Sequence, residues 1–186
     1  MSRDAAFTAI GTERLRLRRF EPRDTSAFHA YRADESVVRF QSWQDYTLED
    51  AERSVEEMER EDPGVPGAPF QFAVVRHDND VLIGDCMLVI HAGDPATAEI
   101  GYTMSPEHQG HGYATEAARG LLAYAFDRYE IAAARAVTDA RNAPSIAVAQ
   151  HLGMHLANTV QTRFKGEACV EQTYEILRET WQKLQT

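Results

Sequence analysis

A glycine-bearing loop between an expected strand and an expected helix constrains this sequence more than any other feature. Residues 98–104 alternate apolar and polar side chains, a pattern typical of a half-buried strand. Residues 114–126 instead repeat apolar side chains at helical spacing. The loop between them delivers the chain to a helix N-terminus, where free backbone N–H groups and the helix dipole favour an anion. Gly110 and Gly112 let the backbone approach that anion without an intervening side chain, so the sequence predicts a phosphate or pyrophosphate site.

Two common types of phosphate loop fit this segment poorly. A Walker-type loop needs a lysine and then a serine or threonine after its last glycine, where this chain has Tyr113 and Ala114. A dinucleotide-binding loop needs a glycine or alanine where Thr115 stands, and an acidic residue at the end of a second strand. Glu130 has nearly the spacing of that acidic residue, but it follows the expected helix. A dinucleotide-binding oxidoreductase therefore stays open only as the less favoured alternative.

The loop resembles the acetyl-coenzyme A loop of the GNAT superfamily of N-acetyltransferases, whose pattern is Gln/Arg-x-x-Gly-x-Gly/Ala. Gln109, Gly112 and Ala114 occupy its three fixed positions. Residues 141–154 are similar to the second conserved segment of the family, in which Asn142 opens a short helix that ends at Gly153. Residues 12–18 and the Asn-x-x-Ser of that segment are most like the Rim-type branch, which contains acetyltransferases of ribosomal-protein N-termini and relatives of other specificity. The resemblance covers roughly residues 12–177.

The resemblance implies an α/β (α+β) fold in a single N-acetyltransferase domain over residues 1–186, with its core at about 12–177. We expect a mixed, mostly antiparallel twisted sheet with helices on both faces, splayed at the acyl-coenzyme A site. The expected strands are residues 13–20, 70–75, 81–90, 98–104, 134–139, 155–163 and 168–177. The expected helices are residues 24–32, one opening at Thr47, residues 114–126, one opening at Asn142, and a terminal helix near Trp181.

Acetyl-coenzyme A is the co-substrate that the resemblance implies, and no metal is required. In this family the pantetheine arm lies in a splay, here between the strand that contains Glu99 and the strand near Val137. A backbone N–H near Met104 would polarise the acyl carbonyl. The expected cofactor-binding residues are Met104, Gln109, Gly110, His111, Gly112, Tyr113, Ala114 and Asn142.

Two residues are candidates for proton transfer. Glu99, ten residues before Gln109, stands close to where several GNAT enzymes carry a catalytic glutamate, and it is our candidate base, directly or through a water. A structural carboxylate at the start of a strand is an equally good interpretation. Ser145 is the candidate acid for the leaving thiolate, because Ala149 stands where many family members have a tyrosine. A serine that only caps a helix is the alternative.

Composition limits the partners. The length of 186 residues with 44% hydrophobic content suits one well-buried domain, and the net charge of −10 argues against nucleic acid. Cys86 and Cys169 have no metal-site spacing, and they suit a reducing cytoplasm. No apolar run reaches the length of a membrane span, and the first residues carry no signal-peptide core, so we expect a cytoplasmic protein without a membrane partner.

The acceptor is the least constrained part of the prediction. An amine is expected, either a small molecule or a protein N-terminus, and a homodimer is compatible with the sequence. Residues 45–62 carry nine carboxylates, which form either a solvated helix face or an acidic rim that steers a cationic amine. A non-catalytic sensor of acyl-coenzyme A on the same fold is the second alternative, although such a protein would be expected to lack a base on the Glu99 strand.

Overall fold

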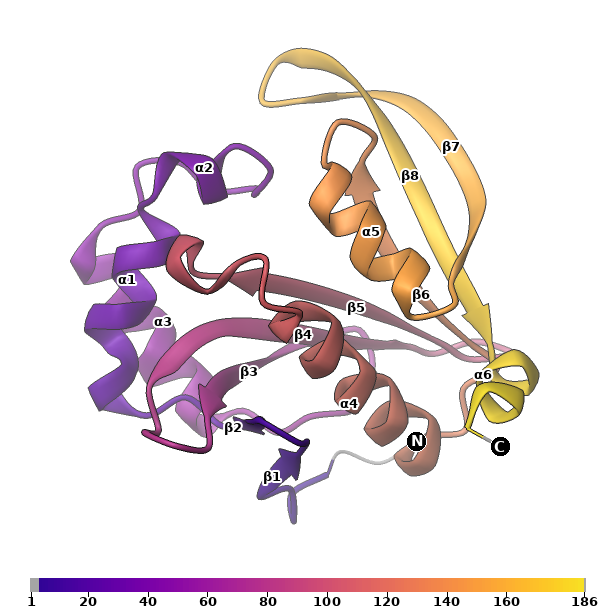
Figure 1. Cartoon of the computed structure of the whole chain (residues 1–186), viewed down its shortest axis with the longest axis horizontal. Helices are drawn as coiled ribbons and strands as arrows, with labels where there is room; N and C mark the ends of the chain where they lie inside the picture. Colours follow the sequence, from indigo (N-terminus) through magenta and orange to yellow (C-terminus); the bar gives the residue numbers. More distant parts are fainter. Residues whose placement is uncertain (1–3, 186) are drawn as a thin grey trace.

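An eight-stranded sheet forms the centre of the protein in a computed structural model that describes residues 4–185 (Figure 1). The strand order is β1-β2-β3-β4-β5-β6-β8-β7. Every neighbouring pair is antiparallel except β5 and β6, which are parallel, so the sheet is mixed as expected. The strands are β1 (Ala9–Gly11), β2 (Leu15–Arg18), β3 (Pro69–Arg76), β4 (Leu82–His91), β5 (Thr97–Met104), β6 (Ala133–Asp139), β7 (His155–Phe164) and β8 (Glu167–Leu177).

Helices cover both faces of this sheet (Figure 1). The helices are α1 (Thr25–Arg32), α2 (Glu35–Val38), α3 (Leu48–Arg60), α4 (Tyr113–Arg128), α5 (Ala143–His151) and α6 (Arg178–Leu184), with short 3-10 helices η1 (Pro22–Asp24) and η2 (Pro106–His108). On one face, α1 and α3 pack against Ala73, Val75 and Leu82. On the other face, α4 contributes its apolar stripe to the larger core, where Leu121 and Leu122 are fully buried.

The two halves of the sheet separate between β5 and β6. These strands pair only from Thr97 with Ala133 to Glu99 with Arg135, although β5 continues to Met104 and β6 to Asp139. The remaining residues diverge, and α5 lies beside the gap (Figure 1). This is the splay that the resemblance to the GNAT superfamily implied.

Several local predictions are confirmed. Thr47 and Asp50 form a capping box at the start of α3. The Asn142 side chain accepts a hydrogen bond from the Ser145 N–H at the start of α5, and Gly153 beyond its end has a φ of +81°.

None of the helices between residues 4 and 185 has the length and apolar content needed to cross a bilayer.

Two elements differ from the prediction. The first is β1, a strand that was not expected. It precedes β2, which takes the place of the strand expected over residues 13–20, and a turn at Thr12 separates the two strands. The second is α2, a helix of four residues whose first turn is capped by the Asp34 side chain. Both elements are shorter than the windows in which hydrophobic periodicity can be recognised.

Candidate active site

A cavity of about 470 Å³ lies at the splay. Its walls come from α2 and the segment after it, the second half of β5, the glycine loop, and α5. Of the residues expected at the site from the sequence, all but Glu99 and His111 line it. The full lining is Ser36, Val37, Phe40, Gln41, Tyr102, Thr103, Met104, His108, Gln109, Gly110, Gly112, Tyr113, Ala114, Thr115, Asn142, Pro144, Ser145, Ala147, Val148 and His151.

The glycine loop reaches the helix through two left-handed residues. Gly110 has a φ of +76° and Gly112 a φ of +79°, and both angles are unfavourable for other residues. Gly112 is the N-cap of α4 and supplies no side chain to its first turn. The N–H groups of the first turn are therefore open toward the cavity, which suits a phosphate. The side-chain amide of Gln109 donates to the Met104 carbonyl at 3.1 Å and so ties the loop to the end of β5.

The wall formed by β5 presents backbone groups to the gap. The Ser105 N–H donates to Ile83 on the β4 side, whereas the Ala96 carbonyl accepts from Ala132 on the β6 side. Because backbone groups alternate in direction along a strand, the N–H groups of Tyr102 and Met104 point toward β6. On the β6 side, no strand within residues 4–185 pairs with this stretch of β5, so these donors are available to an extended ligand in the gap.

Comparison with known proteins decides the family. Residues 14–155 match the family described as Acetyltransferase (GNAT) domain. The chain is 32% identical over 174 residues to YnaD of Bacillus subtilis (strain 168), described as an uncharacterized N-acetyltransferase, and this alignment covers 92% of the chain and 98% of YnaD. The chain belongs to the GNAT acetyltransferase family. Its activity is therefore the transfer of an acetyl group from acetyl-coenzyme A, and the oxidoreductase alternative is set aside.

Solved GNAT structures have the same fold as this acetyltransferase. A GNAT-family acetyltransferase from Bacillus anthracis superposes with a TM-score of 0.82 at 28% identity, covering 92% of this chain and 99% of that one. RimL, a ribosomal L7/L12 alpha-N-protein acetyltransferase solved in complex with coenzyme A, superposes with a TM-score of 0.76 at 18% identity, covering 91% of this chain and 97% of RimL. At that identity, the likeness to RimL concerns the fold.

A pair of hydroxyl groups bridges the gap of the GNAT acetyltransferase. The Tyr102 hydroxyl donates to the Ser145 carbonyl at 2.9 Å, and the Ser145 hydroxyl donates to the Tyr102 oxygen at 3.4 Å. Burial raises the pKa of Tyr102, and the hydrogen bond with Ser145 offsets only part of that effect. The phenol is therefore protonated at neutral pH. The sequence identified Ser145 but not Tyr102, because strand alternation marked this tyrosine simply as an inward-facing residue.

Glu99 lies apart from this cavity. It is the last residue of β5 that pairs with β6, and it occupies the face opposite to the buried neighbours Ala98 and Ile100. Its carboxylate is 3.6 Å from Nε2 of His91, and its side chain is 36% exposed. Its role as a base stays a prediction, and a water would have to connect it to an amine in the cavity.

The α2 segment forms the wall of the cavity opposite α5. Phe40 lines the cavity, and the Gln41 amide donates to the Thr103 hydroxyl at 3.3 Å. Trp43 instead packs on Arg32, whose guanidinium carbon is 3.9 Å from the centre of the indole. The turn between β7 and β8 reaches this wall, because Lys165 Nζ donates at 2.8 Å to two backbone carbonyls of the segment. The acidic helix α3 contributes no side chain to the lining within residues 4–185.

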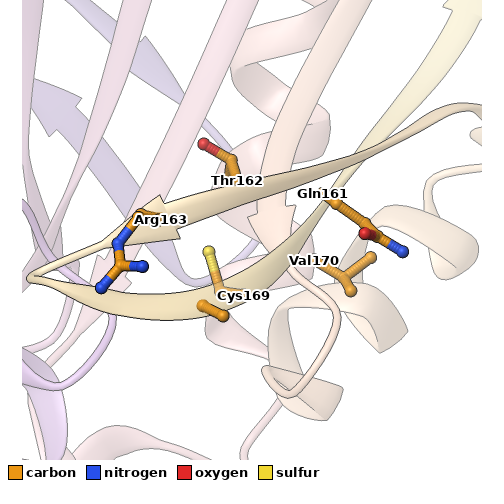
Figure 2. A pocket seen from close by; sticks show the side chains of 6 residues that line it. Gln161, Thr162, Arg163, Cys169 and Val170 are labelled. Atoms are coloured by element: carbon orange, nitrogen blue, oxygen red, sulfur yellow. The ribbon is translucent and has the colours of Figure 1, made fainter.

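A second hollow of about 610 Å³ runs along the β7–β8 hairpin (Figure 2). Its lining comes from this hairpin alone, and every residue of β7 before Phe164 is exposed, so it is a groove at the edge of the sheet. Cys169, which lines it, is half-buried, whereas Cys86 is fully buried. Among the described residues, no three His, Cys, Asp or Glu side chains gather as a metal site would need.

Proposed function

We propose that this acetyltransferase acetylates a primary amine by direct transfer within a ternary complex. One observation carries this proposal: a single cavity extends from the N-terminus of α4, along β5, to α2. An acyl donor bound at the loop and an amine entering beside α2 would therefore meet in one space. The reaction would then need no covalent enzyme intermediate.

The residues of the loop fit the cofactor. The N–H groups from Gly110 to Ala114 would bind the pyrophosphate of acetyl-coenzyme A, and Gln109 would hold that loop against β5. The unpaired N–H of Met104 would donate to the acyl carbonyl and stabilise the charge that develops there. The bound cofactor would supply the activated thioester.

Proton transfer is assigned to two parts of the chain. Glu99 would accept the proton of the amine through a water. The Ser145 hydroxyl, hydrogen-bonded to Tyr102, would supply a proton to the departing thiolate. Ala149, at the position of the usual family tyrosine, is fully buried, so the phenol at this gap comes from β5 instead.

The acceptor would enter between α2 and the tip of the β7–β8 hairpin. Lys165 holds this tip against the end of α2 and the segment after it, which narrows the entrance and favours a slender chain end over a broad molecule. RimL acts on a protein N-terminus, and likeness to its fold supports a protein N-terminus as one candidate beside small amines.

Location and assembly are part of the same proposal. A cytoplasmic enzyme is supported by two free cysteines, which suit a reducing compartment. A homodimer is supported by β7, whose outer edge leaves a row of backbone groups without a strand partner within the described residues. Light scattering on the purified protein tests the dimer.

An amine panel tests the proposed function. Acetyl-coenzyme A is mixed with the protein and, in turn, with peptides, polyamines, amino acids and aminoglycosides, and free thiol is measured. We expect thiol release with at least one free amine and only background release with the same amine acetylated beforehand. Binding of acetyl-coenzyme A without release above background for any amine would instead support the sensor alternative.

A further inference from the structure

We propose that Arg14 is a positioning residue for the pyrophosphate loop, acting by holding the peptide between His111 and Gly112 in one orientation. This inference rests on the proposed role of that loop in binding acetyl-coenzyme A. Arg14 precedes β2 and lies far from the loop in sequence, and the family resemblance assigned it no role at the site.

The Arg14 side chain lies against the three successive residues that lead into α4. Its Nη1 donates to the His111 carbonyl at 3.2 Å. Its guanidinium carbon lies 4.6 Å from the centre of the Tyr113 ring. Its Nη2 lies 3.6 Å from the place that a Cβ on Gly112 would take. The guanidinium therefore lies against the loop from His111 to Tyr113, where the loop becomes helix.

The hydrogen bond to His111 fixes the direction of the next N–H. A trans peptide is planar, and its C=O and N–H groups point in opposite directions. When Arg14 holds the His111 carbonyl, the Gly112 N–H must point away from Arg14. Gly112 lines the cavity and needs no side chain there, so this N–H can contribute to the anion site. A left-handed glycine loop has many other conformations, and this contact selects one of them.

Glu116 holds the guanidinium in place. Its Oε2 accepts from Arg14 Nε at 2.6 Å, and its Oε1 accepts from the Arg14 backbone N–H at 2.7 Å and from the Thr12 hydroxyl at 2.6 Å. Burial raises the pKa of Glu116, but these hydrogen bonds outweigh it and leave the pKa below its ordinary value. The carboxylate is thus ionised and neutralised by Arg14, so it does not repel an anion at the same helix end.

A matched pair of variants separates this role from a simple tether between strand and helix. Arg14→Gln removes the proposed contact, and Arg16→Gln removes an arginine of similar exposure, 43% against 45%, whose ion pair is with Asp80. Affinity is measured for acetyl-coenzyme A and for acetylpantetheine, which has the same acyl arm but no pyrophosphate. Melting temperature is recorded for each variant.

We expect Arg14→Gln to weaken acetyl-coenzyme A binding about tenfold, because a charge-assisted contact and the order of the loop are lost together. Acetylpantetheine binding should stay within twofold, and Arg16→Gln should leave both affinities unchanged. Arg14→Lys should recover only part of the affinity, since one ammonium group cannot reproduce the forked contact to Glu116 and His111.

Unchanged acetyl-coenzyme A affinity in Arg14→Gln, with only a lower melting temperature, would overturn the positioning role. Equal losses for both ligands would also overturn it, because a damaged fold does not distinguish them. If Arg14→Gln does not fold, the comparison is made with Arg14→Lys: a larger loss of affinity for acetyl-coenzyme A than for acetylpantetheine supports the positioning role, and equal losses overturn it. Failure of the unaltered protein to bind acetyl-coenzyme A would refute the proposed function itself, which the first titration shows separately.

Discussion

Substitution of Gly112 by aspartate tests whether the loop binds an anion through its backbone. The φ of +79° at this glycine means that any other residue adds a backbone cost of about 1–2 kcal/mol. Space does not limit the change, because an added Cβ would meet only Arg14 Nη2, at an ordinary contact distance of 3.6 Å. Gly112→Asn carries a similar backbone cost without the charge, and asparagine tolerates the left-handed region, so it is the matched control.

The difference between the two variants isolates the charge. Two unit charges about 4 Å apart repel by about 1 kcal/mol in water and about 4 kcal/mol at an effective dielectric constant of about 20. Calorimetric titration should therefore show acetyl-coenzyme A binding at least about tenfold weaker in Gly112→Asp than in Gly112→Asn, or about 1.4 kcal/mol. Because a Cβ at this position lies 3.6 Å from Arg14 Nη2, the new carboxylate gains a cationic neighbour, and Gly112→Asp should melt no lower than Gly112→Asn. Equal affinities would place the pyrophosphate elsewhere and rule out anion binding by this loop.

Three further predictions concern proton transfer and pH. Glu99→Gln should lower kcat by roughly 10²-fold at neutral pH, and this loss should shrink as rising pH deprotonates the amine; an unchanged kcat across the profile would make Glu99 structural. Ser145→Ala and Tyr102→Phe should each slow turnover without weakening cofactor binding. If Ser145→Ala instead lowers the melting temperature and preserves kcat, Ser145 is only a helix cap, worth about 1 kcal/mol of stability. The pKa of Glu116 in the folded protein lies below its usual 4.5, so ionised Glu116 stabilises the fold fully above pH 4.5, and this stabilisation is lost as pH falls through the folded-state pKa. The unfolding free energy of Glu116→Gln should therefore depend less on pH in acid than that of the unaltered protein. Identical pH profiles of the two proteins would contradict this.

The parts of the fold that the sequence predicted are those encoded locally. The capping box at Thr47, the cap at Asn142 and the left-handed glycines each depend on a few neighbouring residues, so their patterns can be recognised without tertiary structure. The glycine loop is of the same kind. The family resemblance then supplied the mixed, mostly antiparallel sheet and its splay, which local patterns alone do not specify.

The parts that were missed depend on contacts between distant segments. The α2 helix is too short for periodicity, yet it forms one wall of the cavity. Tyr102 meets Ser145 only because β5 and α5 face each other across the splay. Arg14 reaches a loop 97 positions away in the sequence. Charge composition does not show which way a helix faces, so the sequence left the acidic stretch around α3 as either a solvated face or a rim; among the described residues, α3 contributes nothing to the cavity lining.

A crystal structure of the protein with coenzyme A is the most direct test of the proposed binding site. It should place the pyrophosphate within hydrogen-bond distance of the N–H groups from Gly110 to Ala114. The pantetheine arm should lie between the second half of β5 and α5, beside the unpaired N–H of Met104. A pyrophosphate bound away from this loop, or a pantetheine arm outside the splay, would contradict the proposed site.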